Sequence, residues 1–227
     1  MDAITSSPLF GIILCVFTFE LGVWLQKKLK TPLCNPLLIS IALIIAILQV
    51  FKIPLENFMA GGDMISMFLA PATAVLALSI YSQLDVLKKH FLPVVCGCLA
   101  GSVVSMLSAA GLCMAFGLDE TLTAAMIPKS VTTPIAMEIS RQHGGLVAVT
   151  VAAVIFTGIL GAILSPLLIK IFRISHPVAQ GVGIGTSSHA VGTTKAVELG
   201  EIQGAMSGIS IGVSGIITVL LSLFLPM

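Results

Sequence analysis

IPKSVTTPIA, residues 127–136, decides how this chain folds, because it places a lysine, three hydroxyl residues and two prolines between long apolar runs. Pro128 and Pro134 each lack a backbone donor and disrupt a helix, and Pro134 favours extended geometry at Thr133. Inside a membrane, irregular backbone survives only where protein buries it or where it lines a cavity. We therefore expect a helix, a short extended piece near Lys129 and a second helix, enclosed by the rest of the chain.

A second stretch of the same kind is GVGIGTSSHAVGTTKAVE, residues 181–198, and we expect its first three glycines to loosen the backbone. His189 and Thr193 are four residues apart and share a face if the segment is helical. His189 suits either a proton carrier or a hydrogen-bonded bundle histidine, and both interpretations stay open. Lys195 is either a second cation of a binding site or a surface lysine beside Glu198. Two interrupted segments in one chain indicate a binding site near the membrane midplane.

The composition is that of a membrane protein. Of the 227 residues, 57% are hydrophobic and only 9% are charged, whereas a soluble domain has roughly 25% charged residues. We expect an all-α, polytopic integral membrane protein with about six to eight transmembrane helices, two of them broken or re-entrant. The net charge of +1 gives no basic field for nucleic acid. The acidic N-terminus argues against a removable signal peptide.

The order of apolar runs gives the expected topology. We expect one domain over residues 1–227, with a scaffold half, 1–116, and a motif-bearing half, 117–227, that could form an inverted repeat. The expected runs are 8–25, 33–51, 64–81, 92–116, 146–171 and 204–225, with polar loops at 52–63 and 82–90 and the two motif segments at 121–140 and 178–199.

The basic loops indicate how the two motif segments enter the membrane. Lys and Arg gather on the cytoplasmic side. The basic residues of the loops at 26–30, 82–90 and 170–177 share that side, with Arg141 left outside, if segment 121–140 enters and leaves from the outside. We therefore expect a hairpin at 121–140, and a segment 178–199 that breaks mid-membrane or enters from the inside. The expected location is the inner (cytoplasmic) membrane, with several membrane passes.

The two motif segments carry groups suited to one anionic ligand. The half-helix after Pro134 offers free N–H groups to an anion, and Lys129 adds a full positive charge. Hydroxyl groups then match a small carboxylate with hydroxyl or keto oxygens. The predicted binding residues are Lys129, Ser130, Thr132, Thr133, Ser188, His189, Thr193 and Lys195, and the predicted supporting residues are Asn35, Pro71, Thr73, Pro128 and Pro134. No nucleophile–base pair or metal motif is recognisable, so we expect no enzyme, no catalytic residue, no metal and no cofactor.

With these residues in place, the chain resembles the LrgB/CidB family of antiholin-like membrane proteins over nearly its whole length. The blocks PKSVTTPIA at 128–136 and GTxSHAxGT at 185–193 carry most of the resemblance. It also rests on NPLL at 35–38, LxPAxxxLA at 69–77, AxE at 196–198 and GxxSGxxxG at 204–212.

The resemblance implies two competing functions. One is a holin- or antiholin-like modulator of murein hydrolase activity and cell lysis, acting beside a small membrane partner of the LrgA/CidA type. The other is a transporter of small organic acids, since plastid members are glycolate/glycerate translocators and bacterial pairs are linked to pyruvate movement. The residues favour the second, because a lysis pore does not need broken segments that aim cations and hydroxyls at one point. We expect a transporter or facilitator of 2-hydroxy or 2-oxo monocarboxylates that works in the lipid bilayer as a homo-oligomer, a dimer.

Overall fold

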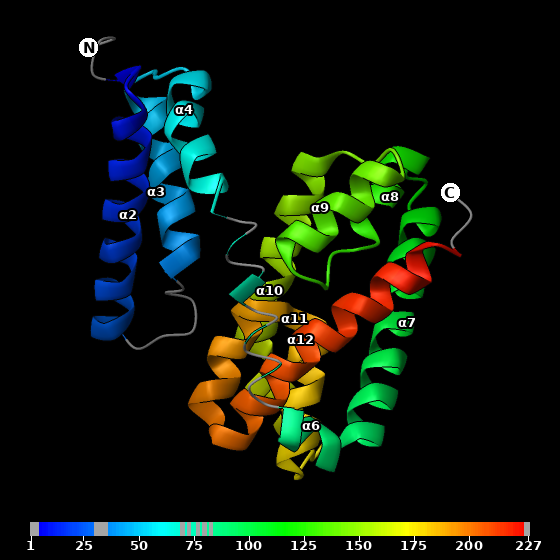
Figure 1. Cartoon of the computed structure of the whole chain (residues 1–227). Coiled ribbons are helices and arrows are strands. Elements are labelled where there is room, and N and C mark those ends of the chain that lie inside the picture. The colour runs from blue at the N-terminus through cyan, green and yellow to red at the C-terminus, as the bar shows by residue number, and fades with distance from the viewer. Residues whose placement is uncertain are drawn as a thin grey trace. The chain divides into compact units, whose positions relative to one another are not determined.

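The computed structural model describes residues 5–29, 36–68, 71, 74–75, 78, 81 and 84–224, and all regular structure within them is helical (Figure 1). The chain divides into two compact units, Met1–Thr73 and Ala74–Met227. The first contains α2 (Pro8–Leu29), α3 (Pro36–Val50) and α4 (Leu55–Ser66); the second contains α6 (Leu84–Lys89), α7 (Phe91–Ala115), α8 (Glu120–Met126), α9 (Thr133–Gln142), α10 (Val147–Ile171), α11 (Pro177–Leu199) and α12 (Glu201–Ser222). The predicted division at residue 116 into a scaffold half and a motif-bearing half stays a prediction.

Four of these helices, α2, α7, α10 and α12, are long and apolar enough to cross a membrane by length and composition, and α3 is a shorter apolar helix. Large apolar side chains on α2 point outward: Leu9, Ile13 and Phe17 recur every fourth residue and are 64%, 65% and 65% exposed. Such a stripe suits lipid contact. The all-helical membrane fold is therefore confirmed, while the expected count of six to eight spans stays a prediction.

The sequence prediction was wrong at three loops. Residues 26–29 of the loop expected at 26–30 form the end of α2. Residues 52–63 contain most of α4, and residues 82–90 contain α6. Pro54, with φ −59°, precedes α4, and a fixed φ of that size suits the start of a helix. The polar residues that suggested a loop are spaced through a helix that is polar on one side. The run expected at 64–81 falls largely outside the described residues.

In the first unit, glycines let α2 pack closely against its neighbours. A Cβ atom on Gly61 of α4 would lie 2.3 Å from the Pro8 carbonyl oxygen, and one on Gly22 of α2 would lie 2.7 Å from the Pro36 carbonyl oxygen. Thr18 Oγ1 and Ser40 Oγ also share a 2.7 Å hydrogen bond between α2 and α3. Close backbone approach and buried hydroxyl pairs are typical of helices packed in lipid.

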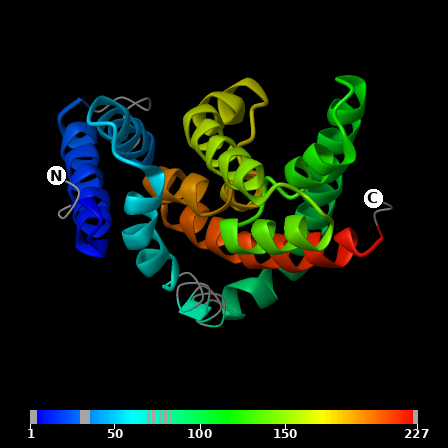
Figure 2. The ribbon, with the colours of Figure 1, turned by 90° about the horizontal axis from the view of Figure 1, so that it is seen from above.

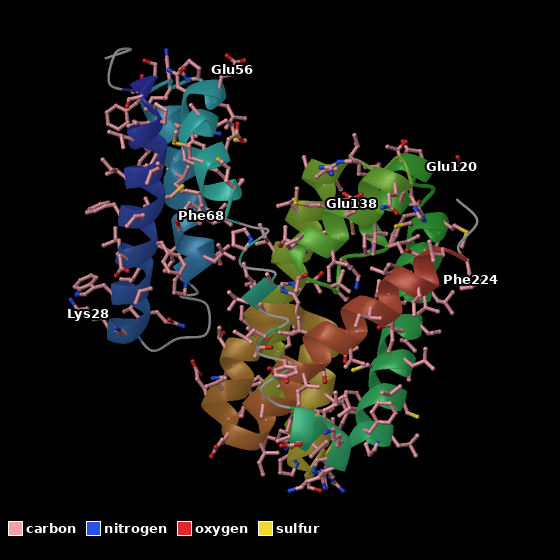
Figure 3. The ribbon with its side chains drawn as sticks, in the orientation of Figure 1. Lys28, Glu56, Phe68, Glu120, Glu138 and Phe224 are labelled. Atoms are coloured by element: carbon pink, nitrogen blue, oxygen red, sulfur yellow. The ribbon has the colours of Figure 1, made fainter. Side chains whose placement is uncertain are left out.

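The second unit contains a helical hairpin formed by α8 and α9. Asp119 caps α8 by accepting a 2.7 Å hydrogen bond from the Leu122 N–H. Residues 127–132 form a turn, and Figure 3 shows Glu120 and Glu138 at the same end of this unit. The extended residue is Thr132, with φ −63° and ψ 148°, rather than the predicted Thr133. Thr133 is helical because Pro134 then falls in the first turn of α9, where a missing N–H costs nothing.

A second hairpin is formed within α11, which breaks at His189. Gly181 and Val197 both lie against the start of α12, at residues 203–204. Gly185 and Thr193 both lie against Ser207. Residues equally far before and after His189 therefore contact the same part of α12. The two arms of α11, 177–188 and 190–199, thus fold back on each other.

The two hairpins reach toward each other from opposite ends of α12, which crosses the second unit obliquely in Figure 1. The arms of α11 pack against its first half, as above. On its second half, a Cβ atom at Gly215 would lie 2.8 Å from Ile135 Cδ1, and His143 Nε2 donates a 3.0 Å hydrogen bond to the Ser222 carbonyl. A buried apolar cluster joins α7, α11 and α12: Val94, Cys98, Val178, Val182, Met206 and Ile209. The hairpin tips therefore meet in the middle of the unit.

Candidate functional site

A cavity of about 430 Å³ lies where the two hairpin tips meet. One wall is α7 and the other is α10, and these helices stand apart in Figure 2. The first tip contributes Lys129 and Ser130, and the second contributes Thr186, Ser187 and Ser188. The remaining lining residues are Gly97, Gly101, Val104 and Ser105 of α7, Thr157, Leu160, Gly161, Leu164 and Leu168 of α10, and Gly183 of α11. Its size is in the range of small-ligand pockets.

Lys129 is the cation of this cavity. Its half-buried side chain donates from Nζ to Ser105 Oγ at 3.4 Å and to Ser130 Oγ at 3.3 Å. The two serine hydroxyls share a 2.6 Å hydrogen bond. Among the described residues, no carboxylate lies within ion-pair distance of Lys129. A half-buried ammonium held only by hydroxyls leaves a positive charge for a bound anion to neutralise.

The second tip supplies a row of hydroxyls. Ser187 Oγ and Ser188 Oγ lie 2.9 Å apart, and Thr186 Oγ1 donates to the Cys98 sulfur of α7 at 3.3 Å. Ser188 is buried and lies directly against Gly161 of α10. A Cβ atom added to Gly161 would lie 1.8 Å from Ser188 Oγ. The tip is therefore wedged between α7 and α10, with the exposed Ser187 facing the cavity.

Three of the predicted binding residues come together at the cavity: Lys129, Ser130 and Ser188. Thr132 and Thr133 lie at the start of α9, behind the first tip. Thr132 is 5% exposed, and its hydroxyl has no hydrogen-bond partner among the described residues. This hydroxyl can therefore still donate and accept hydrogen bonds next to the site, although Thr132 does not line the cavity.

The other three predicted binding residues lie on or beyond the break in α11, outside the cavity lining. His189 Nε2 donates to the Val154 carbonyl of α10 at 2.9 Å, which is the geometry of a bundle histidine. Thr193 Oγ1 pairs with Ser207 Oγ at 2.7 Å. Lys195 Nζ forms a 2.7 Å ion pair with Glu198. We expected Lys129 and Lys195 to lie together at one site. They do not, because Lys195 lies six residues from the break, about 9 Å along a helix.

The supporting residues separate into two groups. Pro128 is fully buried under the first tip, and Pro134 lies in the first turn of α9, so both belong to the hairpin and their supporting role stays a prediction. Asn35 and Thr73 lie outside the described residues. Pro71 is exposed and belongs to the first unit. The supporting roles of these three residues stay predictions.

Sequence reasoning missed the residues that the long helices bring to the cavity. Ser105 of α7 pairs with Ser130, and Thr157 and Gly161 of α10 line the opposite wall. The signal was small residues at helical spacing on otherwise apolar runs. Among the described residues, no group of three His, Cys, Asp or Glu side chains could hold a metal ion.

The sequence matches the model of the LrgB-like family over residues 15–227. The chain belongs to the LrgB-like family. It is 37% identical over 226 residues to an antiholin-like protein LrgB of Bacillus cereus (strain B4264), which covers 99% of this chain and 98% of the relative. An antiholin-like protein LrgB of Bacillus anthracis (strain A0248) matches with the same identity and coverage. No solved structure gives a significant match.

This LrgB-like chain is thus a multi-pass membrane protein, as its composition predicted. The names of its relatives favour the antiholin-like function of the two that the resemblance implied. The prediction of carboxylate transport is not tested by those names.

Proposed function

We propose that this LrgB-like protein is a transporter or facilitator of small 2-hydroxy or 2-oxo monocarboxylates, such as glycolate, glycerate or pyruvate, across the inner (cytoplasmic) membrane. The observation that carries the proposal is Lys129. Its ammonium group borders a cavity of about 430 Å³, hydrogen-bonds only to serine hydroxyls, and has no acidic partner among the described residues.

The ligand class follows from the groups around that ammonium. A carboxylate would neutralise Lys129, and charge-assisted hydrogen bonds are the strong ones. The starts of α9 and of the second arm of α11 adjoin the two tips without lining the cavity, and helix N-termini favour anions. Ser187 and Thr186 could then bind the hydroxyl or keto oxygen on the neighbouring carbon. A purely aliphatic acid would leave those hydroxyls without a ligand partner.

The arrangement of the two hairpins supports transport rather than binding alone. α7 and α10 each have 25 residues and begin 56 residues apart. Ser130 and Thr186, one on each tip, have the same separation. The two helices run in opposite directions, since α7 leads to the first hairpin at one end and α10 to the second hairpin at the other. Inverted pairs of interrupted segments around a central site are typical of secondary transporters, and we propose that both hairpins are re-entrant.

Uptake into proteoliposomes tests the proposal. Labelled glycolate, glycerate and pyruvate should accumulate saturably, and pH and sodium gradients applied in turn identify the coupling ion. Lys129→Ala should abolish uptake, while Lys52→Ala, an exposed lysine of the first unit, serves as the matched control. Lys195→Ala decides whether the second predicted lysine also binds. Absence of saturable uptake of all three acids would refute the proposal, and unchanged uptake in Lys129→Ala would refute the site.

The relatives' names favour a second candidate, a holin- or antiholin-like modulator of murein hydrolase activity and lysis. In that function we propose a homodimer that acts beside an LrgA/CidA-type membrane partner. It predicts altered autolysis, or leakage of dyes larger than a three-carbon acid, without a saturable substrate. Lys129→Ala would then leave the lysis phenotype unchanged.

A further inference from the structure

A second cavity, of about 520 Å³, adjoins the first at one end of the second unit. It lies between the start of α7 and the start of α11. Its walls include His90 and His176, which directly precede these two helices. Gly97 and Gly183 line both cavities. The two spaces therefore adjoin at a pair of glycines, one on each helix.

The surroundings of the second cavity suit an anion. Lys89 directly precedes His90, and Arg173 lies three residues before His176; both are exposed. Lys88 is also exposed and pairs with Asp85 at 3.6 Å. Among the described residues, neither cavity is lined by a carboxylate. Positive charge around a concave, low-dielectric opening raises the local concentration of anions.

We propose that a small carboxylate reaches Lys129 through this second cavity, from the end of the unit that carries His90 and His176, and that Gly97 and Gly183 form the passage. This inference rests on the proposed transport function. Glycine matters here because it leaves the passage open. A Cβ atom at Gly183 would meet no atom within 4 Å, and one at Gly97 would meet the Val182 side chain at 2.9 Å. A side chain at position 183 would thus occupy the passage without disturbing the packing.

Thiol labelling tests whether the passage holds water. The five native cysteines are first replaced, and single cysteines are then introduced as Gly183→Cys, Gly111→Cys, Arg173→Cys and Glu120→Cys. Gly111 is the matched control, because a Cβ atom there also meets nothing within 4 Å but the residue lines neither cavity. A charged, membrane-impermeant maleimide should label Gly183→Cys from the same side as Arg173→Cys and from the side opposite to Glu120→Cys. Gly111 lies on the exposed side of the apolar helix α7, where we expect lipid to cover it. Gly111→Cys should therefore react about tenfold more slowly, because an apolar environment suppresses the thiolate.

Glycerate should slow the labelling of Gly183→Cys without affecting Arg173→Cys. Labelling of Gly183→Cys as slow as that of Gly111→Cys, or labelling from the Glu120→Cys side, would overturn the passage. The rate and the side of labelling are independent of transport, because labelling itself needs no substrate.

Blocking the passage tests its use. Gly183→Trp should abolish glycerate uptake, whereas Gly208→Trp, on α12 and equally free of neighbours within 4 Å, should retain it. Uptake retained in both variants would overturn the inference while leaving the proposed function intact. No uptake by the unmodified protein would instead refute the function, and the labelling result would still decide whether the opening exists.

Discussion

Replacing Gly161 by alanine should displace the second hairpin tip. The new Cβ atom would lie 1.8 Å from Ser188 Oγ and 2.4 Å from Ser188 Cβ, whereas carbon atoms in contact are about 3.5–4.0 Å apart. Rotating the serine hydroxyl removes only the first clash. Since the Cβ atom is also too close, the backbone of the tip has to move away from α10.

The expected cost follows from two opposing terms. Overpacking a well-packed core costs about 1–3 kcal/mol, and the double clash places this site at the upper end. Alanine returns up to about 1 kcal/mol relative to glycine inside a helix. The net loss should be about 2 kcal/mol, which lowers Tm by roughly 4–8 °C for a chain of this size.

Once the exposed Cys96 is replaced, a dye that fluoresces on reacting with thiols can follow the unfolding of this unit, because Cys98 and Cys113 are buried. Gly111→Ala is the control and should be slightly more stable than the unmodified protein. In Gly161→Ala/Ser188→Gly, the nearest atom of residue 188 to the new Cβ is its Cα, at 3.6 Å, so the clash is relieved. The double variant should therefore be about 2 kcal/mol more stable than the sum of the single effects predicts. If Gly161→Ala melts with Gly111→Ala, the tip does not lie against α10.

Three other variants test separate parts of the structure. His189 has φ 41° and ψ −143°, a conformation that strains any residue except glycine. The free energy of unfolding of His189→Gly should therefore exceed that of His189→Ala by about 1 kcal/mol, with a correspondingly higher Tm. An equal Tm would contradict the strained break. Ser105→Ala removes one of the hydroxyls that hold Lys129, so KM for glycerate should rise about fivefold, the effect of one hydrogen bond; an unchanged KM in uptake kinetics would exclude Ser105 from the site. Gly61→Ala places a Cβ atom 2.3 Å from the Pro8 carbonyl oxygen, a backbone clash that no rotamer relieves, so α4 should become more sensitive to limited proteolysis than in Gly62→Ala.

The sequence predicted which two segments are interrupted, but not the residue at which the second one breaks. Pro128 and Pro134 have one structural consequence each, so the first turn could be deduced from them. In the second stretch we expected the glycines to loosen the backbone. Instead, Gly181 and Gly185 allow the first arm to pack against Gln203 and Ser207 of α12, and the break occurs at His189. These glycines therefore serve close packing between helices distant in the sequence. No local conformational propensity identifies a histidine as the residue at which the helix breaks.

The cavity could be predicted only in part, because its lining also depends on long-range packing. Lys129, Ser130 and Ser188 lie in segments whose polarity is anomalous in a membrane. Ser105 and Gly161 lie on regular apolar helices, where a small residue is equally typical of ordinary helix packing. Which small residues face a cavity depends on how α7 and α10 are placed around the two tips, and helical spacing alone does not contain that information.

The 56-residue separation also gives a counterpart for each glycine of the proposed passage. Applied to Gly97 and Gly183, it leads to Ala153 on α10 and Ile127 at the end of α8. Ala153 is 9% exposed and Ile127 is 2% exposed, whereas Gly183 faces open space. The two pairs of positions therefore differ in packing: Gly183 has open space beside it and a Cβ atom at Gly97 would meet only the Val182 side chain, whereas Ile127 and Ala153 are buried. A carrier with a fixed central site requires this asymmetry, because a path open at both ends would let the ligand and water leak. A non-selective pore would need both positions open, so the packing of Ile127 favours the carrier.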